Sequence, residues 1–385
     1  MDFIFYQFTP LTFGLCIAAG SILLLQILYF FLIYGSVAWY RLPSQRKKAE
    51  QPLGYQPSVS VVIVTKDEQE NLKQRLPVIL EQQYPNFEVV VVNNASSDET
   101  EFMLKVLAKI YPQLKIVNLY EETPNKFQGK KYLLSLGIKS AKNDYILLTN
   151  ANCVPNSYFW IDNMVKGLTA KKNIVLGYNL YERKNTLLNT LIQYESLNNA
   201  INYEGMALWG NPYKATGDNL IISRQEFFNT GGFIPYYNIS SGDMDLYVNR
   251  IAKRKTTSVI LHEEAYVKTE APQSLSAWCR QKRRRLRTAH FYRFWGRFIV
   301  ATPTITTLLL YALLSILFFT GFPYQWILAA LILKFFIQIL LFRKSSFVLM
   351  KNKLSIFAPI FEIFFLFFNV IIGINTLFSK KERWD

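Results

Sequence analysis

The sequence predicts an α/β domain with a mostly parallel, Rossmann-like sheet, joined to α-helical transmembrane segments. Long apolar runs gather at the two ends of the 385 residues, and short β-branched runs alternate with helical patterns between them. The hydrophobic share of 51% is enough for membrane segments in addition to a soluble core. We expect a tail (1–10), a transmembrane helix (11–39), a basic linker (40–54), the α/β domain (55–272), an amphipathic interfacial helix (273–297), a membrane region of about three spans (298–378) and a tail (379–385).

The first apolar run, residues 11–39, contains no charged residue and is long enough to cross a bilayer as a helix. A cleaved signal peptide is the alternative interpretation. It is disfavoured because no basic region precedes the run and because the apolar stretch is too long. We therefore expect the run to stay in the membrane.

Three further apolar runs cover residues 298–319, 326–342 and 354–378. The second of these runs contains Lys334 and Gln338, and the last contains Glu362. Ionisable groups at membrane depth are costly and usually face a bundle interior or water. These residues could serve a lipid or glycan path, or they could pair with one another in packing, and the sequence leaves both open.

The placement of lysine and arginine predicts the orientation. Basic residues follow the first run, fill 280–297 before the second and separate the third from the fourth, whereas the connection GFPYQ has none. This places the α/β domain on the cytoplasmic face of the cell's inner (plasma) membrane. Lys380, Lys381 and Arg383 disagree, because four complete spans would put them outside. Either the last run is re-entrant or the charge bias fails there.

The net charge of +16 does not indicate nucleic-acid binding, because the basic residues lie mainly beside the apolar runs, where anionic membrane lipids attract them. No nucleic-acid motif interleaves them with aromatic residues. The three cysteines have neither pairing nor metal-site spacing, and the two histidines form no metal pair. Reduced thiols and the absence of zinc are expected.

Within the central region, β-branched runs at 59–65, 87–94 and 145–149 are typical of buried parallel strands. Helical patterns separate them, so helices should cover both faces of the sheet. Ligands bind at the carboxyl ends of the strands in such sheets. The residues that follow these runs are therefore the candidates for a site.

Six motifs follow one another between residues 59 and 287: VSVVIVTKDEQENL, VVVVNNASSDET, GKKYLLSLGIKSAKNDYILLTNAN, TGDNLIISRQEFFNTGGF, SGDMDL and WCRQKRRRLR. In this order the chain resembles the family 2 glycosyltransferases, which have a GT-A fold. Each motif alone is weak, but their serial order between membrane segments is specific. The resemblance implies a membrane enzyme that transfers a sugar from a nucleotide-sugar donor.

The resemblance also implies roles for individual residues. The catalytic base, which deprotonates an acceptor hydroxyl, is Asp243 by position, and Asp245 would orient a helix or position the base. A helix N-cap is the alternative role for Asp243. Gln281 and Arg284 would meet the diphosphate, whereas Arg280, Lys282, Arg283, Arg285 and Arg287 would mostly anchor the helix on membrane lipids. The nucleotide would be held by Thr65, Asp67, Glu68, Asn94, Asp98 and Lys130, the last after Gly129. Asp98 could equally cap the next helix.

The chain departs from the family at the metal motif, which is usually Asp-x-Asp and here is Asn150-Ala151-Asn152. Mg²⁺ and Mn²⁺ prefer anionic oxygen ligands, so binding of a divalent cation by Asn150 and Asn152 should be weak or absent. Asn93 likewise replaces a usual acidic residue. Three explanations stay open: a metal-independent enzyme in which lysine and arginine neutralise the diphosphate, an inactive homologue that binds nucleotide or glycan, or a cation held mainly by the substrate's phosphates.

A second departure is Arg285, which stands where processive relatives have the Trp of Gln-x-x-Arg-Trp. That indole stacks on the acceptor sugar in those relatives, so its loss disfavours a polymer synthase. The sequence thus favours transfer of one sugar to a lipid-linked or surface-glycan acceptor, with inversion at the anomeric carbon. The alternative is a non-enzymatic subunit that binds nucleotide or glycan.

Overall fold

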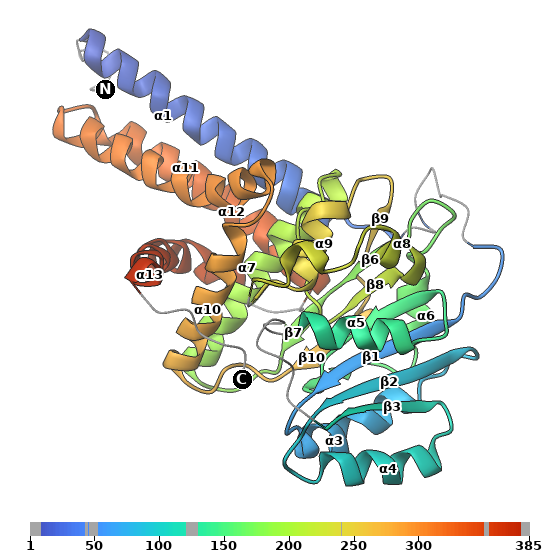
Figure 1. Cartoon of the computed structure of the whole chain (residues 1–385). Helices are drawn as coiled ribbons and strands as arrows, with labels where there is room; N and C mark the ends of the chain where they lie inside the picture. Colours follow the sequence, from blue (N-terminus) through green and yellow to red (C-terminus); the bar gives the residue numbers. More distant parts are fainter. Residues whose placement is uncertain are drawn as a thin grey trace.

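The computed structural model describes residues 9–42, 45, 53–120, 130–239, 241–349 and 354–378. A sheet domain covered by helices occupies one part of the molecule, and long helices extend away from it (Figure 1). Most of the linker and both tails lie outside the described residues, and so do Gly129, Lys380, Lys381 and Arg383.

The main sheet has seven strands in the order β3-β2-β1-β4-β8-β6-β9. Their bounds are β1 Val59–Thr65, β2 Phe87–Asn94, β3 Leu114–Leu119, β4 Tyr145–Leu148, β6 Ile174–Gly177, β8 Leu220–Ser223 and β9 Thr257–Ile260. The pairs β1–β2, β1–β4, β2–β3 and β6–β9 are parallel, whereas β8 is antiparallel to both β4 and β6. The expected α/β class is confirmed, and the sheet is mixed because β8 runs against its neighbours.

A second, three-stranded sheet has the order β5-β10-β7, with bounds β5 Cys153–Pro155, β7 Asn179–Tyr181 and β10 Val267–Thr269. β7 starts two residues after β6 ends, and β5 follows β4 after a short turn. The second sheet therefore continues from the carboxyl ends of β4 and β6, where a ligand site is expected.

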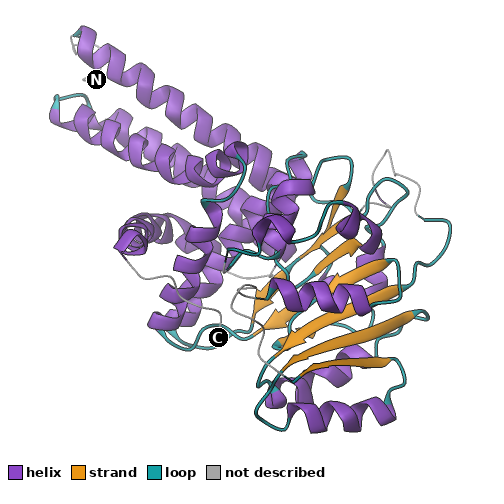
Figure 2. Ribbon diagram, in the orientation of Figure 1, coloured by secondary structure: helices purple, strands orange, loops and turns teal. Residues whose placement is uncertain are grey.

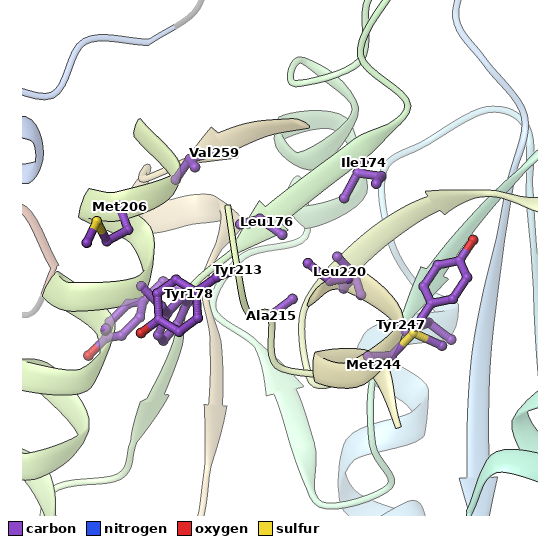
Figure 3. Packing of buried hydrophobic residues seen from close by; sticks show 14 of the residues in the cluster. Ile174, Leu176, Tyr178, Met206, Tyr213, Ala215, Leu220, Met244, Tyr247 and Val259 are labelled. Carbon is purple, nitrogen blue, oxygen red and sulfur yellow. The ribbon is translucent and has the colours of Figure 1, made fainter. Parts of the chain in front are cut away.

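Alternate residues of β1 pack into two separate cores. Val62 and Val64 belong to the core shared with α5 (Lys131–Ser140) and α7 (Leu187–Trp209), whereas Val61 and Ile63 belong to the core under α3 (Gln69–Leu80) and α4 (Thr100–Ile110). Figure 3 shows the first core around Leu176, Leu220 and Val259. Strands buried on both faces explain the continuous apolar runs in the sequence.

Close packing requires a small residue where α5 crosses the sheet. A Cβ atom on Gly137 would lie 2.5 Å from the Val62 side chain. The remaining short helices of the domain are α6 (Trp160–Val165), α8 (Arg224–Asn229) and α9 (Met244–Ile251). Helices cover both faces of the sheet, as the strand–helix alternation predicts (Figure 2).

Four helical segments are long and apolar enough to cross a membrane by length and composition: Pro10–Ala38, Phe294–Phe319, Tyr324–Leu349 and Leu354–Thr376. The first consists of α1 (Pro10–Tyr29), a π-helical turn (Phe30–Tyr34) and α2 (Gly35–Ala38), and the next two are α11 and α12. The last begins with a 3₁₀ turn and continues as α13 (Ala358–Phe378). α1 and α11 run side by side away from the sheet (Figure 1).

The polar residues within these helices bond one another. Glu362 Oε1 accepts hydrogen bonds from Lys334 Nζ and from Tyr311 Oη, the latter at 2.7 Å, and Glu362 Oε2 accepts one from Gln338 Nε2 at 2.7 Å. The three donors and the acceptor come from α11, α12 and α13. Of the two interpretations that the sequence left open, the structure therefore shows polar packing between helices.

The amphipathic helix is shorter than expected. α10 spans Leu275–Ala289, not 273–297, and α11 already begins at Phe294. The turn between them is fixed by Asn249, whose Oδ1 accepts a hydrogen bond from the backbone N–H of Arg293 at 2.8 Å. A Cβ on Gly296 would lie 2.7 Å from the same Asn249 side chain. The expected end of this helix was wrong because a tertiary contact breaks the helical run.

Candidate active site

A cleft of about 350 Å³ lies among β7, α7, α10, the start of α9 and the segments that follow β4 and precede β8. Six of the residues expected from the sequence line it, namely Lys130, Asn150, Asp243, Asp245, Gln281 and Arg284. Asn150 follows the last residue of β4 by two positions. The cleft is thus at the carboxyl end of a central strand, as expected for this sheet.

Asn150 is tied to two charged neighbours. Its Oδ1 accepts a hydrogen bond from Lys130 Nζ, and its Nδ2 donates one to Asp218 Oδ1. The other oxygen of Asp218 accepts a hydrogen bond from Asn179 Nδ2 at 2.6 Å. These hydrogen bonds connect four side chains of the cleft in one row: Lys130, Asn150, Asp218 and Asn179.

Asp243 stands at the N-cap position of α9, but its side chain makes no capping hydrogen bond. Its Oδ1 lies 3.3 Å from Nζ of Lys131, a fully buried lysine. Lys131 Nζ also donates to the backbone carbonyls of Ile239 and Ser241, at 2.6 and 3.0 Å. The lysine thus holds the loop that carries Asp243 and provides a counter-charge for its carboxylate.

The loop before Asp243 packs closely on α10. Gly242 has φ +78°, and a Cβ at this position would lie 2.2 Å from the Thr288 methyl group. Ser241 and Thr288 share a hydrogen bond of 2.8 Å between their hydroxyls. Only glycine fits this approach, so the Ser-Gly before Asp243 fixes the carboxylate relative to α10.

Asp245 and Lys214 both line the cleft, and the charge of each affects the pKa of the other. Burial raises the pKa of Asp245, and Asp245 Oδ2 accepts a hydrogen bond from Tyr292 Oη at 3.0 Å. Burial, reinforced by the charge of Arg285, lowers the pKa of Lys214 to about 8. Lys214 is therefore a cation whose charge changes near neutral pH.

α10 presents Gln281, Arg284 and Arg285 to the cleft. Gln281 Nε2 donates to Tyr181 Oη at 3.0 Å, and Arg285 donates to the same hydroxyl at 3.4 Å. The expectation that Arg285 mostly anchors the helix on lipid is corrected by this position. Gln281 and Arg284 line the cleft, and their expected diphosphate role remains a prediction.

Lys282 was also expected to contact membrane lipids, but it lies inside the protein. Its side chain is buried, its Nζ is ion-paired with Glu195 of α7, and it donates to Asn369 Oδ1 of α13 at 2.8 Å. Trp278, one turn earlier, donates to the other Glu195 oxygen at 2.8 Å. This face of α10 is directed into the protein, because Glu195 offers a carboxylate that the sequence pattern did not reveal.

Of the residues expected to hold the nucleotide, only Lys130 lines the cleft, and the other five lie at or just after the carboxyl ends of β1 and β2. Asp67, with φ +52°, accepts hydrogen bonds from the backbone N–H and hydroxyl of Ser97, at 2.6 and 3.0 Å. These bonds lower the pKa of Asp67. Asp98 accepts from the N–H groups of Gln69 and Thr100, at 3.2 and 3.0 Å. Asp98 therefore accepts a hydrogen bond from the start of α4, as in the alternative role given above. The carboxylates of Asp67 and Asp98 together connect the loop after β1 with the loop after β2.

The expected nucleotide-binding residues also include Thr65, Asn94 and Glu68. Thr65 and Asn94 are buried, and Thr65 Oγ1 and Asn94 Oδ1 have no hydrogen-bond partner among the described residues. Glu68 accepts a hydrogen bond from Asn71. Asn152 does not line the cleft; its backbone carbonyl accepts a hydrogen bond from Arg75. Asn150 therefore lines the cleft and Asn152 does not, although both belong to the same sequence motif.

The polar residues of the site that sequence reasoning missed include Lys131, Asn179, Lys214 and Asp218. Asp218 belongs to the TGDN motif that was identified, so the motif itself gave a signal for it. Lys131 follows directly after the expected Lys130. Asn179 and Lys214 lie in segments without a recognisable motif, and only the fold brings them to the cleft.

The residues of the cleft do not fit a divalent cation well. The Asn150 side-chain oxygen, the ligand that the motif would supply, is engaged by the Lys130 ammonium group. Among the described residues, no group of three or more His, Cys, Asp or Glu could hold a metal ion. At the motif position Asn150 offers a neutral amide oxygen beside a lysine, not the anionic ligand that Mg²⁺ and Mn²⁺ prefer. The neighbouring carboxylate of Asp218 already accepts hydrogen bonds on both oxygens, from Asn150 and Asn179.

Comparisons with known proteins bear on the chain as a whole. A family model described as glycosyl transferase family 2 matches residues 60–238. A probable glycosyltransferase of Bacillus subtilis is 24% identical over 280 residues, which cover 69% of this chain and 63% of the relative. A poly-β-1,6-N-acetyl-D-glucosamine synthase of Staphylococcus epidermidis is 26% identical over 200 residues, 51% of this chain and 44% of the relative. The chain thus spans less than two thirds of each of these relatives.

A mannosyltransferase from Pyrobaculum calidifontis, solved in complex with GDP-mannose and Mn²⁺, superposes with a TM-score of 0.62. The match covers 96% of this chain and 99% of that protein, at 18% sequence identity. At this identity the likeness shows the fold, and it extends to the helices outside the sheet.

Proposed function

The chain belongs, through residues 60–238, to the family 2 glycosyltransferases and has the GT-A fold, and from this premise we propose that it transfers a sugar from a nucleotide-sugar donor to a lipid-linked or surface-glycan acceptor. The observation that carries the proposal is the cleft in which Asp243 faces the cationic groups of Lys130, Lys214, Arg284 and Arg285. A base and a set of cations in one cleft are what glycosyl transfer requires.

In the proposed reaction, Asp243 removes the proton from an acceptor hydroxyl. The acceptor oxygen attacks the anomeric carbon, the bond to the diphosphate breaks, and the nucleoside diphosphate leaves with its added negative charge. Attack opposite the leaving group inverts the anomeric carbon. The position of Asp243 supports this role, because its carboxylate makes no capping hydrogen bond and is held beside the buried Lys131.

Charge on the departing diphosphate would be neutralised by side chains of this protein. Lys130, Lys214, Arg284 and Arg285 provide cations in a cleft that excludes part of the solvent, where such charges act strongly. The engagement of Asn150 by Lys130 supports this view over a protein-held metal. We therefore propose that transfer does not depend on a divalent cation.

The helices long enough to cross a membrane place the proposed reaction at a membrane surface. Arg41, Arg343 and Lys344 flank the spans on the side of the sheet domain, which supports a cytoplasmic domain on the inner membrane of the cell. Replacement of the family's Trp by Arg285, whose guanidinium bonds Tyr181, supports a single transfer over polymer synthesis.

Purified full-length protein tested with a panel of nucleotide sugars, with EDTA and with Mn²⁺, examines the proposal. We expect donor hydrolysis or transfer that persists in EDTA. Strict dependence on Mn²⁺ would refute metal independence and would place a cation on the donor phosphates. Donor binding without turnover under every metal condition would instead identify an inactive, nucleotide-binding subunit, an outcome that the Asn150-Ala151-Asn152 motif makes worth measuring.

A further inference from the structure

A second cavity, of about 780 Å³, lies among the helices that can cross a membrane. Its walls come from α1, the π-helical turn, α7, α11 and α13, with Gln338 from α12. Most of its lining is apolar or aromatic, for example Leu28, Phe298 and Leu366. The volume is in the range of about 300–1,000 Å³ that is usual for ligand sites.

Two residues that line this apolar space each have a buried amide oxygen without a described hydrogen-bond partner. Gln26 is 5% exposed and donates from Nε2 to Thr307 Oγ1 at 3.3 Å, but its Oε1 has no hydrogen-bond partner among the described residues. Gln338 is 4% exposed, and its Oε1 is likewise without a described partner. Both residues line the cavity. A buried acceptor left unpaired costs about 1–3 kcal/mol, so a ligand that donates to it is favoured.

The orientation of the Gln338 amide is fixed by its neighbour. Because the carboxylate of Glu362 accepts a hydrogen bond from Gln338 Nε2, the amide oxygen is the atom left over. This oxygen is a hydrogen-bond acceptor, so a ligand group that bonds to it must be a donor.

The charges around the cavity restrict the ligand further. Glu362 lines it, and none of its described lining residues is a lysine or arginine. The charge of Glu362 is already balanced by Lys334, so a phosphate group placed here would find no free cation among the described lining residues. We propose that this cavity binds a neutral lipid that carries hydroxyl groups, whose acyl chains fill the apolar part and whose hydroxyls donate to Gln26 and Gln338.

The proposed lipid site adjoins the cleft across a single helix. Tyr194, Asn198 and Asn202 of α7 line the membrane cavity, whereas Ser196, Asn199 and Tyr203 line the cleft. Residues four apart share a face of a helix, so α7 separates the two spaces with two adjacent faces. The site needs no sugar donor, and its test is therefore independent of transfer.

The test uses the full chain in nanodiscs of phosphatidylcholine that contain a small share of diacylglycerol with a photoactivatable group in one acyl chain. We expect cross-links concentrated on the cavity-lining parts of α1, α11 and α13. Excess unlabelled diacylglycerol should abolish them, and excess polyprenyl phosphate should not. Labelling spread evenly over the outer helix surfaces, or equal competition by polyprenyl phosphate, would overturn the proposal.

Two variants sharpen the test, and thermal unfolding checks that each is folded. Gln26→Leu removes one acceptor at similar volume and should reduce competition by diacylglycerol about tenfold, which corresponds to one lost hydrogen bond of about 1.4 kcal/mol. Ser315→Ala, a polar deletion on the exposed face of α11 outside the cavity, is its control. Unchanged competition in Gln26→Leu would contradict the assigned contact.

Leu28→Trp adds bulk at an exposed wall of the cavity and should block labelling without overpacking a core. Leu24→Trp makes the same change one turn earlier on α1, at an exposed position outside the lining, and should leave labelling intact. Equal labelling of the two tryptophan variants would show that the lipid does not enter the cavity.

Discussion

Asp243 is the residue on which proposed catalysis depends most directly. Asp243→Asn keeps the shape of the side chain but removes the basic oxygen. We expect kcat for transfer to fall by about 10² or more, while the dissociation constant of the donor changes little. Transfer kinetics and donor titration on the same preparation measure both quantities.

Asp245→Asn serves as the comparison for Asp243→Asn. Asp245 bonds Tyr292 and is not tied to Lys131, so we expect a smaller loss of kcat from this variant. Unchanged turnover in Asp243→Asn, together with a large loss in Asp245→Asn, would move the base to Asp245.

Lys214 makes the reaction sensitive to alkaline pH. Its pKa of about 8 means that it is protonated below this pH and loses its charge as the pH rises through it. Burial and the charge of Arg285 lower the pKa of Lys214, whereas Asp245 and Glu195 raise it. Since we propose that this cation stabilises the leaving diphosphate, we expect kcat/KM to decline above about pH 8.

The control for this pH profile is Lys214→Arg, because a guanidinium stays charged throughout the accessible range. The alkaline decline should move upward in Lys214→Arg. In Lys214→Met, transfer should be about tenfold slower or more and should lack this decline, since a unit charge within 10 Å is worth about 1.5 kcal/mol at an effective dielectric constant of 20. The same decline in all three proteins would assign it to another group.

The two asparagines of the motif should respond differently to a carboxylate. Asn150→Asp adds negative charge beside Asp218 and the proposed diphosphate, so metal-free transfer should slow by about tenfold or more. Asn152→Asp, outside the cleft, should change the rate much less. Rates in EDTA and in Mn²⁺ measure the difference. Faster transfer by Asn150→Asp in Mn²⁺ would indicate a protein that has lost its metal ligands.

Residue identity in the cleft was predictable where a motif fixes it. Asp243, Lys130 and Asn150 were found because each lies in a short pattern. Lys214 and Asn179 were not, because their place in the cleft follows from how β7 and β8 lie in the folded chain. The functional roles of all these residues remain predictions until they are tested.

At the scale of elements, α10 connects the cleft to the membrane helices. Breaking a buried ion pair leaves an uncompensated charge, so Lys282→Met should lower the free energy of unfolding by about 3 kcal/mol or more. Thermal or denaturant unfolding of the full chain in detergent measures this. The exposed Arg280 provides the matched control, and Arg280→Met should have little effect. Equal losses in the two variants would mean that the Glu195 contact contributes nothing specific.

The strands and spans were predictable because their signals are local. Continuous β-branched runs predicted β1 and β2 to the residue, and long apolar runs predicted the four membrane-length helices. The end of α10 and its inward face were not, because Asn249 and Glu195 act from distant parts of the sequence. A basic helix pattern does not reveal which of its cations has a buried partner.

In the whole molecule, the GT-A domain lies beside a helix bundle in which Lys334, Gln338 and Glu362 bond one another. The sheet domain lies between the first and second helices that can span a membrane, so its side is decided by how those helices insert. The short turn between α11 and α12 must then be on the opposite side, because α11 separates it from the domain. This topological relation holds whichever side faces the cytoplasm.

Orientation can therefore be tested with a pair of introduced cysteines in a protein whose Cys16, Cys153 and Cys279 have been replaced. Lys109→Cys is on the exposed surface of α4 in the sheet domain, and Thr320→Cys is exposed at the end of α11. If the domain is cytoplasmic, a membrane-impermeant maleimide should label intact cells at Thr320→Cys but not at Lys109→Cys. Opening the membrane should then expose Lys109→Cys. The reverse pattern would contradict the cytoplasmic assignment, and labelling of both sites on intact cells would show that α11 does not cross the membrane.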